Sequence, residues 1–372
     1  MSGAVRAVVW KEVREIRRDP VTIFVAALLP LVMLFLFGYA LSLDVKNAPY
    51  AVYDLDRSAH SRDLADTFAH SGYFRRAHDI VSDAEVGRLL DRGQARLVLV
   101  IPADFSERIA RGDTAHVQTL IDGSFSATAM VIAGYAAAIV QDFSMRHARA
   151  AAAGSVGPAI RVQGRVWFNA PLESVYYIVP GLFGVILMAF PPLLTALAVV
   201  REKESGSVQQ IFVSPIAPWE FIAGKALPYA VIAFLEMAVI LAAGVLWFRV
   251  PFRGSLPLFL FATVLYVLCT VGLGLLVSTI TRSQLVAMLL AILVTLMPAF
   301  LFSGFLFPIF TMPEMMQWYT YLFPARYFVE ISRGIIMKGT GPASWWPQLA
   351  ALALYTGVVF GAAAAAFRKK VA

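Results

Sequence analysis

The sequence predicts a mainly α-helical membrane protein, with six transmembrane helices and an inserted extracytoplasmic α/β domain. Composition is the first reason, because 59% of the 372 residues are hydrophobic and 15% are charged. Soluble proteins are about half apolar and about a quarter charged. The second reason is the pattern: long apolar segments occur along the chain, and residues 44–173 alternate between strand-like and helix-like stretches.

Residues 1–20 are predicted to form an amphipathic helix that lies along the cytoplasmic membrane surface. A proline disfavours helical backbone in the residue before it, so the helix ends at the step from Asp19 to Pro20. The residues that recur at helical spacing are Val5, Val8 or Val9, Glu12 or Val13, and Ile16.

Six segments have the length of about 20 apolar residues that crosses a bilayer as a helix. Residues 21–43 contain the first, and residues 174–367 contain the other five. The short polar break from Thr281 to Gln284 fits a tight turn at the membrane surface between spans four and five. The six predicted spans are Val21–Leu43, Val175–Val200, Phe221–Phe248, Leu256–Ile280, Leu285–Ile309 and Trp345–Phe367.

The basic residues that flank these spans predict that both termini are cytoplasmic. They lie before span one, after spans two and four, and in the tail at 368–372, which are all on the same side. The first apolar run is longer than a signal-peptide core and follows acidic residues, so we expect it to remain uncleaved. The basic residues are Arg6, Lys11, Arg14, Arg17, Arg18, Arg201, Lys203, Arg282, Arg368, Lys369 and Lys370.

The segment 44–173 is predicted to be the extracytoplasmic α/β domain, because strand and helix patterns alternate along it. It carries 14 basic and 15 acidic residues, so the positive net charge of the chain belongs to the membrane part. That excess indicates a positive-inside bias rather than nucleic-acid binding. Strands are expected at 51–55, 74–81, 96–101 and 117–121, and helices at 61–69, 83–92, 104–111 and 128–152.

No catalytic or metal-binding arrangement can be argued from residue spacing. All five histidines lie within 44–173 at no ligand spacing, and Cys269 is the single cysteine. The chain also lacks a Gly-x-x-x-x-Gly-Lys-Ser/Thr motif, so it has no P-loop of its own. We therefore expect no intrinsic catalytic site and no metal or cofactor bound by this chain.

Three groups of residues follow one another in the predicted topology, and together they resemble the permease subunits of ABC-type exporters. The resemblance is to the second export type, in the branch with a large outside domain between spans one and two. The groups are Arg165–Asn169 with Ile178–Gly181; Arg201–Ser207 with Ser214, Pro215, Glu220, Gly224, Lys225, Pro228 and Tyr229; and Ser303–Pro308 with Met312, Pro313, Pro324–Phe328, Arg333, Gly334, Lys338 and Gly339.

The resemblance implies that two permease chains, identical or paralogous, pair above two ATP-binding cassette subunits, which use the ATP. It places a coupling loop near 201–219, where a mixed-charge segment contacts the ATPase. Family loops often carry Thr after the glycine and an acidic residue two positions later, where this chain has Ser207 and Gln209. The expected coupling-loop residues are Arg201, Glu202, Lys203, Glu204, Ser205, Gly206 and Gln209.

The segment 304–341 is broken by prolines and is too interrupted for a simple span. The resemblance implies short helices that re-enter from the outer surface, with irregular backbone buried by protein. Arg326 and Arg333 lie outside the positive-inside pattern, so we expect each to pair with Glu314 or Glu330 or to contact lipid headgroups. The residues singled out in this segment are Pro308, Arg326, Tyr327 and Arg333.

Glu236 lies near the middle of span three. An ionisable group at that depth costs at least about 2.5 kcal/mol on insertion scales and usually faces a cavity or a partner. Three interpretations remain open: the carboxyl lines the substrate path, relays protons, or forms a hydrogen bond between helices.

The resemblance implies a permease subunit of an ATP-driven exporter in the bacterial cytoplasmic (inner) membrane, moving hydrophobic or amphiphilic, drug-like or lipid-like compounds outward. Its expected partners are an ATP-binding cassette subunit, a second permease chain, a periplasmic adaptor protein and membrane lipids, with no nucleic acid. The alternative is a membrane-anchored receptor or envelope scaffold without transport, with the α/β domain as its binding module. An ion-coupled transporter is disfavoured, because Glu236 is the one acidic residue deep in a span and no repeat relates the halves.

Overall fold

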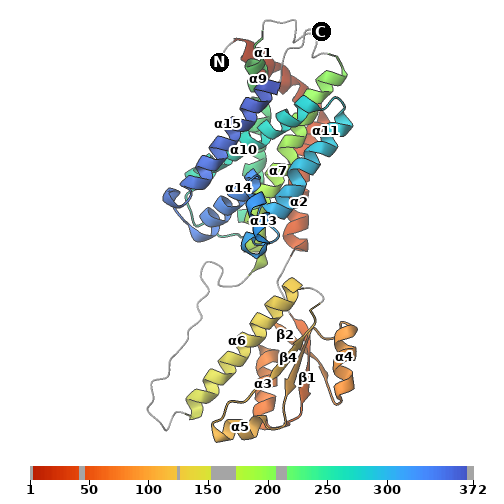
Figure 1. Ribbon diagram of the computed structural model, residues 1–372, viewed down its shortest axis with the longest axis vertical. Coiled ribbons are helices and arrows are strands. Elements are labelled where there is room, and N and C mark those ends of the chain that lie inside the picture. Colours follow the sequence, from red (N-terminus) through yellow and green to blue (C-terminus); the bar gives the residue numbers. More distant parts are fainter. Residues whose placement is uncertain (1–2, 42–46, 124–125, 152–172, 207–215, 367–372) are drawn as a thin grey trace. The chain divides into compact units, whose positions relative to one another are not determined.

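The computed structural model describes residues 3–41, 47–123, 126–151, 173–206 and 216–366. The chain divides into two compact units. Residues 1–42 and 166–372 form one unit, which we call the membrane unit, and residues 43–165 form the α/β unit. Figure 1 shows that the membrane unit is built from helices, whereas the α/β unit contains a sheet with helices on both of its faces.

The membrane unit contains long apolar helices and several short ones. Helix α1 and the end of α15 lie at the same end of this unit (Figure 1). The elements are α1 (Gly3–Arg18), α2 (Pro20–Ala40), α7 (Ser174–Glu204), α9 (Pro218–Leu246), α10 (Leu256–Ile280), α11 (Gln284–Ala291), η2 (Ile292–Leu296), α12 (Met297–Phe302), η3 (Ile309–Thr311), α13 (Glu314–Thr320), α14 (Pro324–Arg333), η4 (Gly334–Lys338), η5 (Pro342–Ser344) and α15 (Trp346–Ala366).

Seven helices in the described part of the chain are long and apolar enough to cross a membrane. Six of them overlap the six spans that the sequence predicts, with α11, η2 and α12 counted as one helix over Gln284–Phe302. The seventh, Thr128–His147, belongs to the α/β unit. Length and composition therefore support a multi-pass protein, and the count of six spans stays a prediction.

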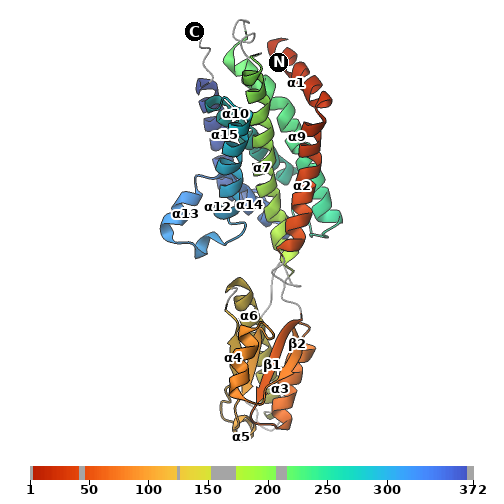
Figure 2. The same ribbon diagram turned by 90° about the vertical axis from the view of Figure 1, so that its right-hand side faces the viewer.

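Helix α7 is the central helix of the membrane unit. It packs against α2, α9, α10, α11 and α14, and Figure 2 shows it between α2 and α9 on one side and α10 and α12 on the other. In its most apolar stretch 78% of the residues are buried, because helices pack around it on several sides. Gly274 of α10 allows α10 to pack closely on α7, since a Cβ at this position would meet the backbone of Pro192 in α7.

The sheet of the α/β unit has the strand order β2-β1-β3-β4. The central strand β1 is parallel to both neighbours, and β4 is antiparallel to β3. The four strands overlap the four ranges expected from the sequence. They are β1 (Ala48–Asp54), β2 (Phe74–Asp79), β3 (Leu97–Ile101) and β4 (Gln118–Ile121).

Helices cover both faces of this sheet. Helices α3 (Ala59–His70), α5 (Phe105–Arg111) and α6 (Ser126–Ala151) pack on one apolar face, around Tyr50 and Phe68. Helix α4 (Asp83–Asp91) covers the other face, around Ala51 and Val98 (Figure 1). The alternation of Tyr50 and Ala51 between the two faces follows from the two-residue period of a strand.

Candidate functional site

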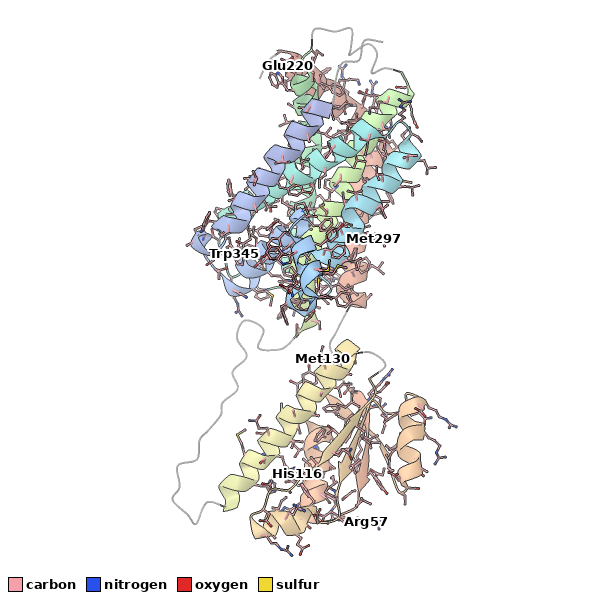
Figure 3. All side chains as sticks on the ribbon, viewed as in Figure 1. Arg57, His116, Met130, Glu220, Met297 and Trp345 are labelled. Carbon is pink, nitrogen blue, oxygen red and sulfur yellow. The ribbon has the colours of Figure 1, made fainter. Side chains whose placement is uncertain are left out.

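The N-terminal helix α1 packs on α9 through its apolar face, at the end of the membrane unit where α9 begins. Figure 3 shows Glu220 of α9 at this end, and Trp345 lies toward the other end. Val8 packs at Gly224, where a Cβ would collide with the valine side chain. Glu12 shares the buried face of α1 with Val5 and Val8. A carboxylate on an apolar face needs a partner, because an uncompensated buried charge is costly.

The partner of Glu12 is Lys225, the residue after Gly224 on α9. The two side chains form an ion pair and are both about 1% exposed. Lys225 also pairs with Glu202 of α7 at 2.9 Å, and Glu202 pairs with Lys11 of α1. Lys11 lies 3.3 Å from Glu15 as well. We call Lys11, Glu12, Glu15, Glu202 and Lys225 the charge cluster; it joins α1, α7 and α9.

The charge cluster contains three carboxylates close enough to hold a metal ion, from Glu12, Glu15 and Glu202. Two ammonium groups already lie among the same oxygens. Lys225 contacts Glu12 and Glu202, and Lys11 contacts Glu15 and Glu202. The arrangement therefore fits a salt-bridge network rather than a metal centre.

The described part of the predicted coupling loop is the C-terminal turn of α7 and the residues after it. Arg201 donates to Asp19 at 2.6 Å, and Asp19 also caps the N-terminus of α2 through the amides of Val21 and Thr22. Gly206 has a φ of 74°, in the left-handed region where glycine commonly ends a helix. Residues 207–215, which include Ser207 and Gln209, lie outside the described residues.

The next two charged residues of this turn reach the opposite side of the bundle. Lys203 donates to the carbonyls of Ser278, Thr279 and Thr281 at the end of α10. Glu204 accepts from the amide of Gln284 at 2.7 Å and from its side chain, at the start of α11. A cation at a helix C-terminus and an anion at an N-terminus both complement the helix dipole. Within the described residues, the end of α7 is thus bonded to α1, to the α1–α2 junction, and to α9, α10 and α11.

The hydrogen bond from Arg201, together with smaller contributions from the bonds of Thr22, lowers the pKa of Asp19 from its ordinary value of 3.8 to about 2. Asp19 is therefore ionised across the physiological pH range. It anchors the junction of α1 and α2 to the end of α7. An open cleft of about 670 Å³ lies beside this pair and is lined by Arg18, Asp19, Arg201 and Glu202 among others.

Glu236 lies apart from the charge cluster, on the face of α9 that packs toward α2. Its carboxyl group is buried, and neither oxygen has a hydrogen-bond partner among the described residues. The helix–helix hydrogen bond considered from the sequence is therefore absent from the described part of the chain. Glu236 instead lines a groove of about 310 Å³ between α2 and α9.

The segment 304–341 folds into η3, α13, α14 and η4, and α14 buries one face against α7, α10 and α15. Arg333 donates to the carbonyls of Tyr177, Gly304 and Phe305 and stacks on the ring of Tyr177 at 3.6 Å. Of the two alternatives expected from the sequence, pairing of Arg333 with Glu314 or Glu330 is not found among the described residues. The guanidinium group of Arg333 instead donates its hydrogen bonds to three backbone carbonyls, which thereby gain a partner.

Arg326 is bonded in a similar way within the same segment. It donates to the hydroxyl of Thr320 and to the carbonyl of Gln317 at 3.2 Å, and it stacks on Tyr321. Tyr327 donates to the carbonyl of Tyr321 at 2.9 Å. Pro308 precedes η3, and its carbonyl accepts from Thr311. The contacts of Pro308, Arg326 and Tyr327 are local, whereas Arg333 joins the segment to α7. The four residues therefore stabilise the fold of the segment and do not meet at one site.

Comparison with known proteins places this architecture in a family. Residues 20–365 match the model of the ABC-2 family transporter protein. The chain is 34% identical over 362 residues, 97% of each chain, to the probable multidrug ABC transporter permease YbhR of Escherichia coli (strain K12). It is 36% identical to YbhS, another probable multidrug ABC transporter permease of that strain, over 91% of this chain and 89% of the relative. The inner membrane transport permease YhhJ of that strain is 30% identical over 87% and 86%.

Proposed function

The chain belongs to the ABC-2 family as a multi-pass membrane permease, and we propose that it is the transmembrane subunit of an exporter driven by a separate ATP-binding subunit. Its cargo would be hydrophobic or amphiphilic compounds, moved out of the cytoplasm or the inner membrane. Two relatives are named probable multidrug ABC transporter permeases, which supports this cargo class. Two permease chains would pair, with both termini in the cytoplasm and a periplasmic adaptor on the α/β unit.

The observation that carries this proposal is the set of bonds at the end of α7. Four consecutive residues contact four different parts of the bundle. Arg201 binds the α1–α2 junction, and Glu202 binds Lys11 and Lys225 of α1 and α9. Lys203 binds the end of α10, and Glu204 binds the start of α11. A load applied to the loop after Gly206 would reach all these helices together. This is the mechanical property that a coupling element needs if a partner ATPase moves it.

Affinity purification of the tagged chain in mild detergent tests the proposal. We expect a P-loop ATPase to copurify in about equal amounts, and ATP hydrolysis by the complex to respond to amphiphilic compounds. Recovery of the chain without an ATPase across several detergents would overturn the exporter assignment in favour of the scaffold.

The role of the charge cluster has its own test within that complex. Glu202→Gln removes the carboxylate that joins Lys11 to Lys225, so we expect the ATPase to bind but to lose its response to amphiphiles. Glu314→Gln is the matched control, because Glu314 is exposed on α13. An unchanged response in Glu202→Gln would remove the cluster from the coupling path.

A further inference from the structure

The groove between α2 and α9 is apolar and contains one carboxyl group. Among the described residues that line it, Glu236 is the one ionisable group, and the rest are apolar apart from Thr22. The hydroxyl of Thr22 is already used, since it donates to Asp19 at 2.9 Å. The carboxyl of Glu236 is therefore the polar feature that a molecule in this groove would meet.

The helix backbone beside this groove lacks one of its usual donors. Pro30 lies inside α2 and has no N–H, so it cannot give the carbonyl of Ala26 its usual hydrogen bond. Ala26 and Pro30 both line the groove. The site thus combines a carboxyl group with a carbonyl that lacks its usual helical donor, and it has no cationic residue among its described lining residues.

We propose that this groove binds a hydrophobic ammonium ion, with the amine at Glu236 and the apolar body between α2 and α9. A primary ammonium group carries donors and no acceptor, which matches the two acceptors of the groove. Its positive charge would compensate the carboxylate in surroundings where an isolated charge is costly. The volume of about 310 Å³ lies at the lower end of the range for small-molecule sites, so the ligand is small or partly held by lipid.

This inference rests on the proposed function, because it names a substrate class for the same permease. Two other occupants would leave Glu236 without a counter-charge: a lipid acyl chain and a neutral drug-like molecule. Neither explains why a carboxyl group is buried there without a partner in the described residues. Charge complementarity therefore favours the ammonium ion.

Photolabelling of the full-length permease in lipid nanodiscs tests the proposal without nucleotide or ATPase. The probe is a diazirine-bearing alkylamine, and its N-acetylated form has the same apolar body without the charge. We expect the amine to label peptides of α2 and α9 in the wild type. Labelling should fall about tenfold or more in Glu236→Gln, since a hydrogen bond to a charged group is typically worth that factor.

The N-acetylated probe should label both proteins equally and weakly, which also shows that the variant is folded. Glu330→Gln is the matched control, because Glu330 is exposed on α14 and outside the groove. Glu236→Asp keeps the charge and should keep the preference for the amine. If Glu236→Gln cannot be produced, loss of the amine preference in Glu236→Asp would count against the proposal.

A second measurement locates the ligand. Ala27 is exposed and lines the groove, so Ala27→Cys in a Cys269→Ala background places a thiol beside Glu236. The amine, and not its N-acetylated form, should slow modification of this thiol by a maleimide. Equal labelling by both probes in the wild type, or equal protection by both, would show a groove filled by lipid and would overturn the inference. Such a failure would leave ATPase copurification, and hence the proposed function, untouched.

Discussion

At the scale of single residues, Lys225 holds the charge cluster together, because it pairs with two buried carboxylates on different helices. Lys225→Met removes the ammonium group and leaves Glu12 and Glu202 to share Lys11. Breaking a buried ion pair from one side typically costs about 3–5 kcal/mol. We therefore expect a markedly lower unfolding temperature for the purified permease in detergent.

The exposed Lys338 provides the control for this change. Lys338→Met should leave the unfolding temperature within error of the wild type, since exposed charges contribute little. Adding Glu12→Gln to Lys225→Met should restore part of the stability, because it removes a buried carboxylate that has lost its Lys225 partner. A stable Lys225→Met protein would mean that the cluster is not a stabilising network.

The pair of Asp19 and Arg201 predicts a pH dependence. The folded-state pKa of Asp19, about 2, lies below its ordinary value of 3.8, so its contribution is full above about pH 3.8 and is lost as the pH falls toward 2. Asp19→Asn removes the charge and keeps a good N-cap residue. The stability gap between wild type and Asp19→Asn should be largest at neutral pH and close below pH 3.8. Thermal unfolding of both proteins from pH 7 to pH 2 measures this gap, and a gap that stays constant over the whole range would show that the charge of Asp19 does not contribute.

At the scale of elements, the close packing of α7 on α10 depends on Gly274. A Cβ at this position would meet the backbone of Pro192, which cannot move aside as a flexible side chain can. Overpacking typically costs about 1–3 kcal/mol, so Gly274→Ala should lower the unfolding temperature. Gly357→Ala in α15 is the control, because no atom lies within 4 Å of its Cβ position. Alanine favours a helix over glycine, so a loss of stability in the control but not in Gly274→Ala would contradict this packing argument.

The sequence alone predicts the elements better than their contacts. Apolar runs such as Leu256–Ile280 and the alternation around Tyr50 depend on local pattern, which a single sequence displays. The pairing of Lys225 with Glu12 joins positions 213 residues apart, and local pattern does not reveal such pairs. One signal was present, since Glu12 lies at an apolar position of an amphipathic helix and therefore needs a buried partner. The contacts of Arg333 gave no such signal, because its partners are backbone carbonyls.

At the scale of the whole molecule, the two units differ in what holds them together. The α/β unit has its own apolar cores on both faces of a sheet, whereas the membrane unit combines apolar packing with polar bonds at the end of α7. Each unit therefore has apolar packing of its own among the described residues.

The direction of the chain through the membrane distinguishes six spans from seven, because Thr128–His147 is apolar enough to cross. Single cysteines in a Cys269→Ala background at the exposed residues Arg6, Val81 and Glu314 report their side of the membrane to an impermeant maleimide. With six spans and a cytoplasmic N-terminus, intact spheroplasts should label Val81→Cys and Glu314→Cys, and permeabilised ones Arg6→Cys as well. If Thr128–His147 crossed the membrane, every later span would be inverted, and Glu314→Cys would require permeabilisation. We expect the first pattern, because α6 buries Ile132, Ala136 and Phe143 against the sheet, and those side chains would leave that core if the helix entered the bilayer.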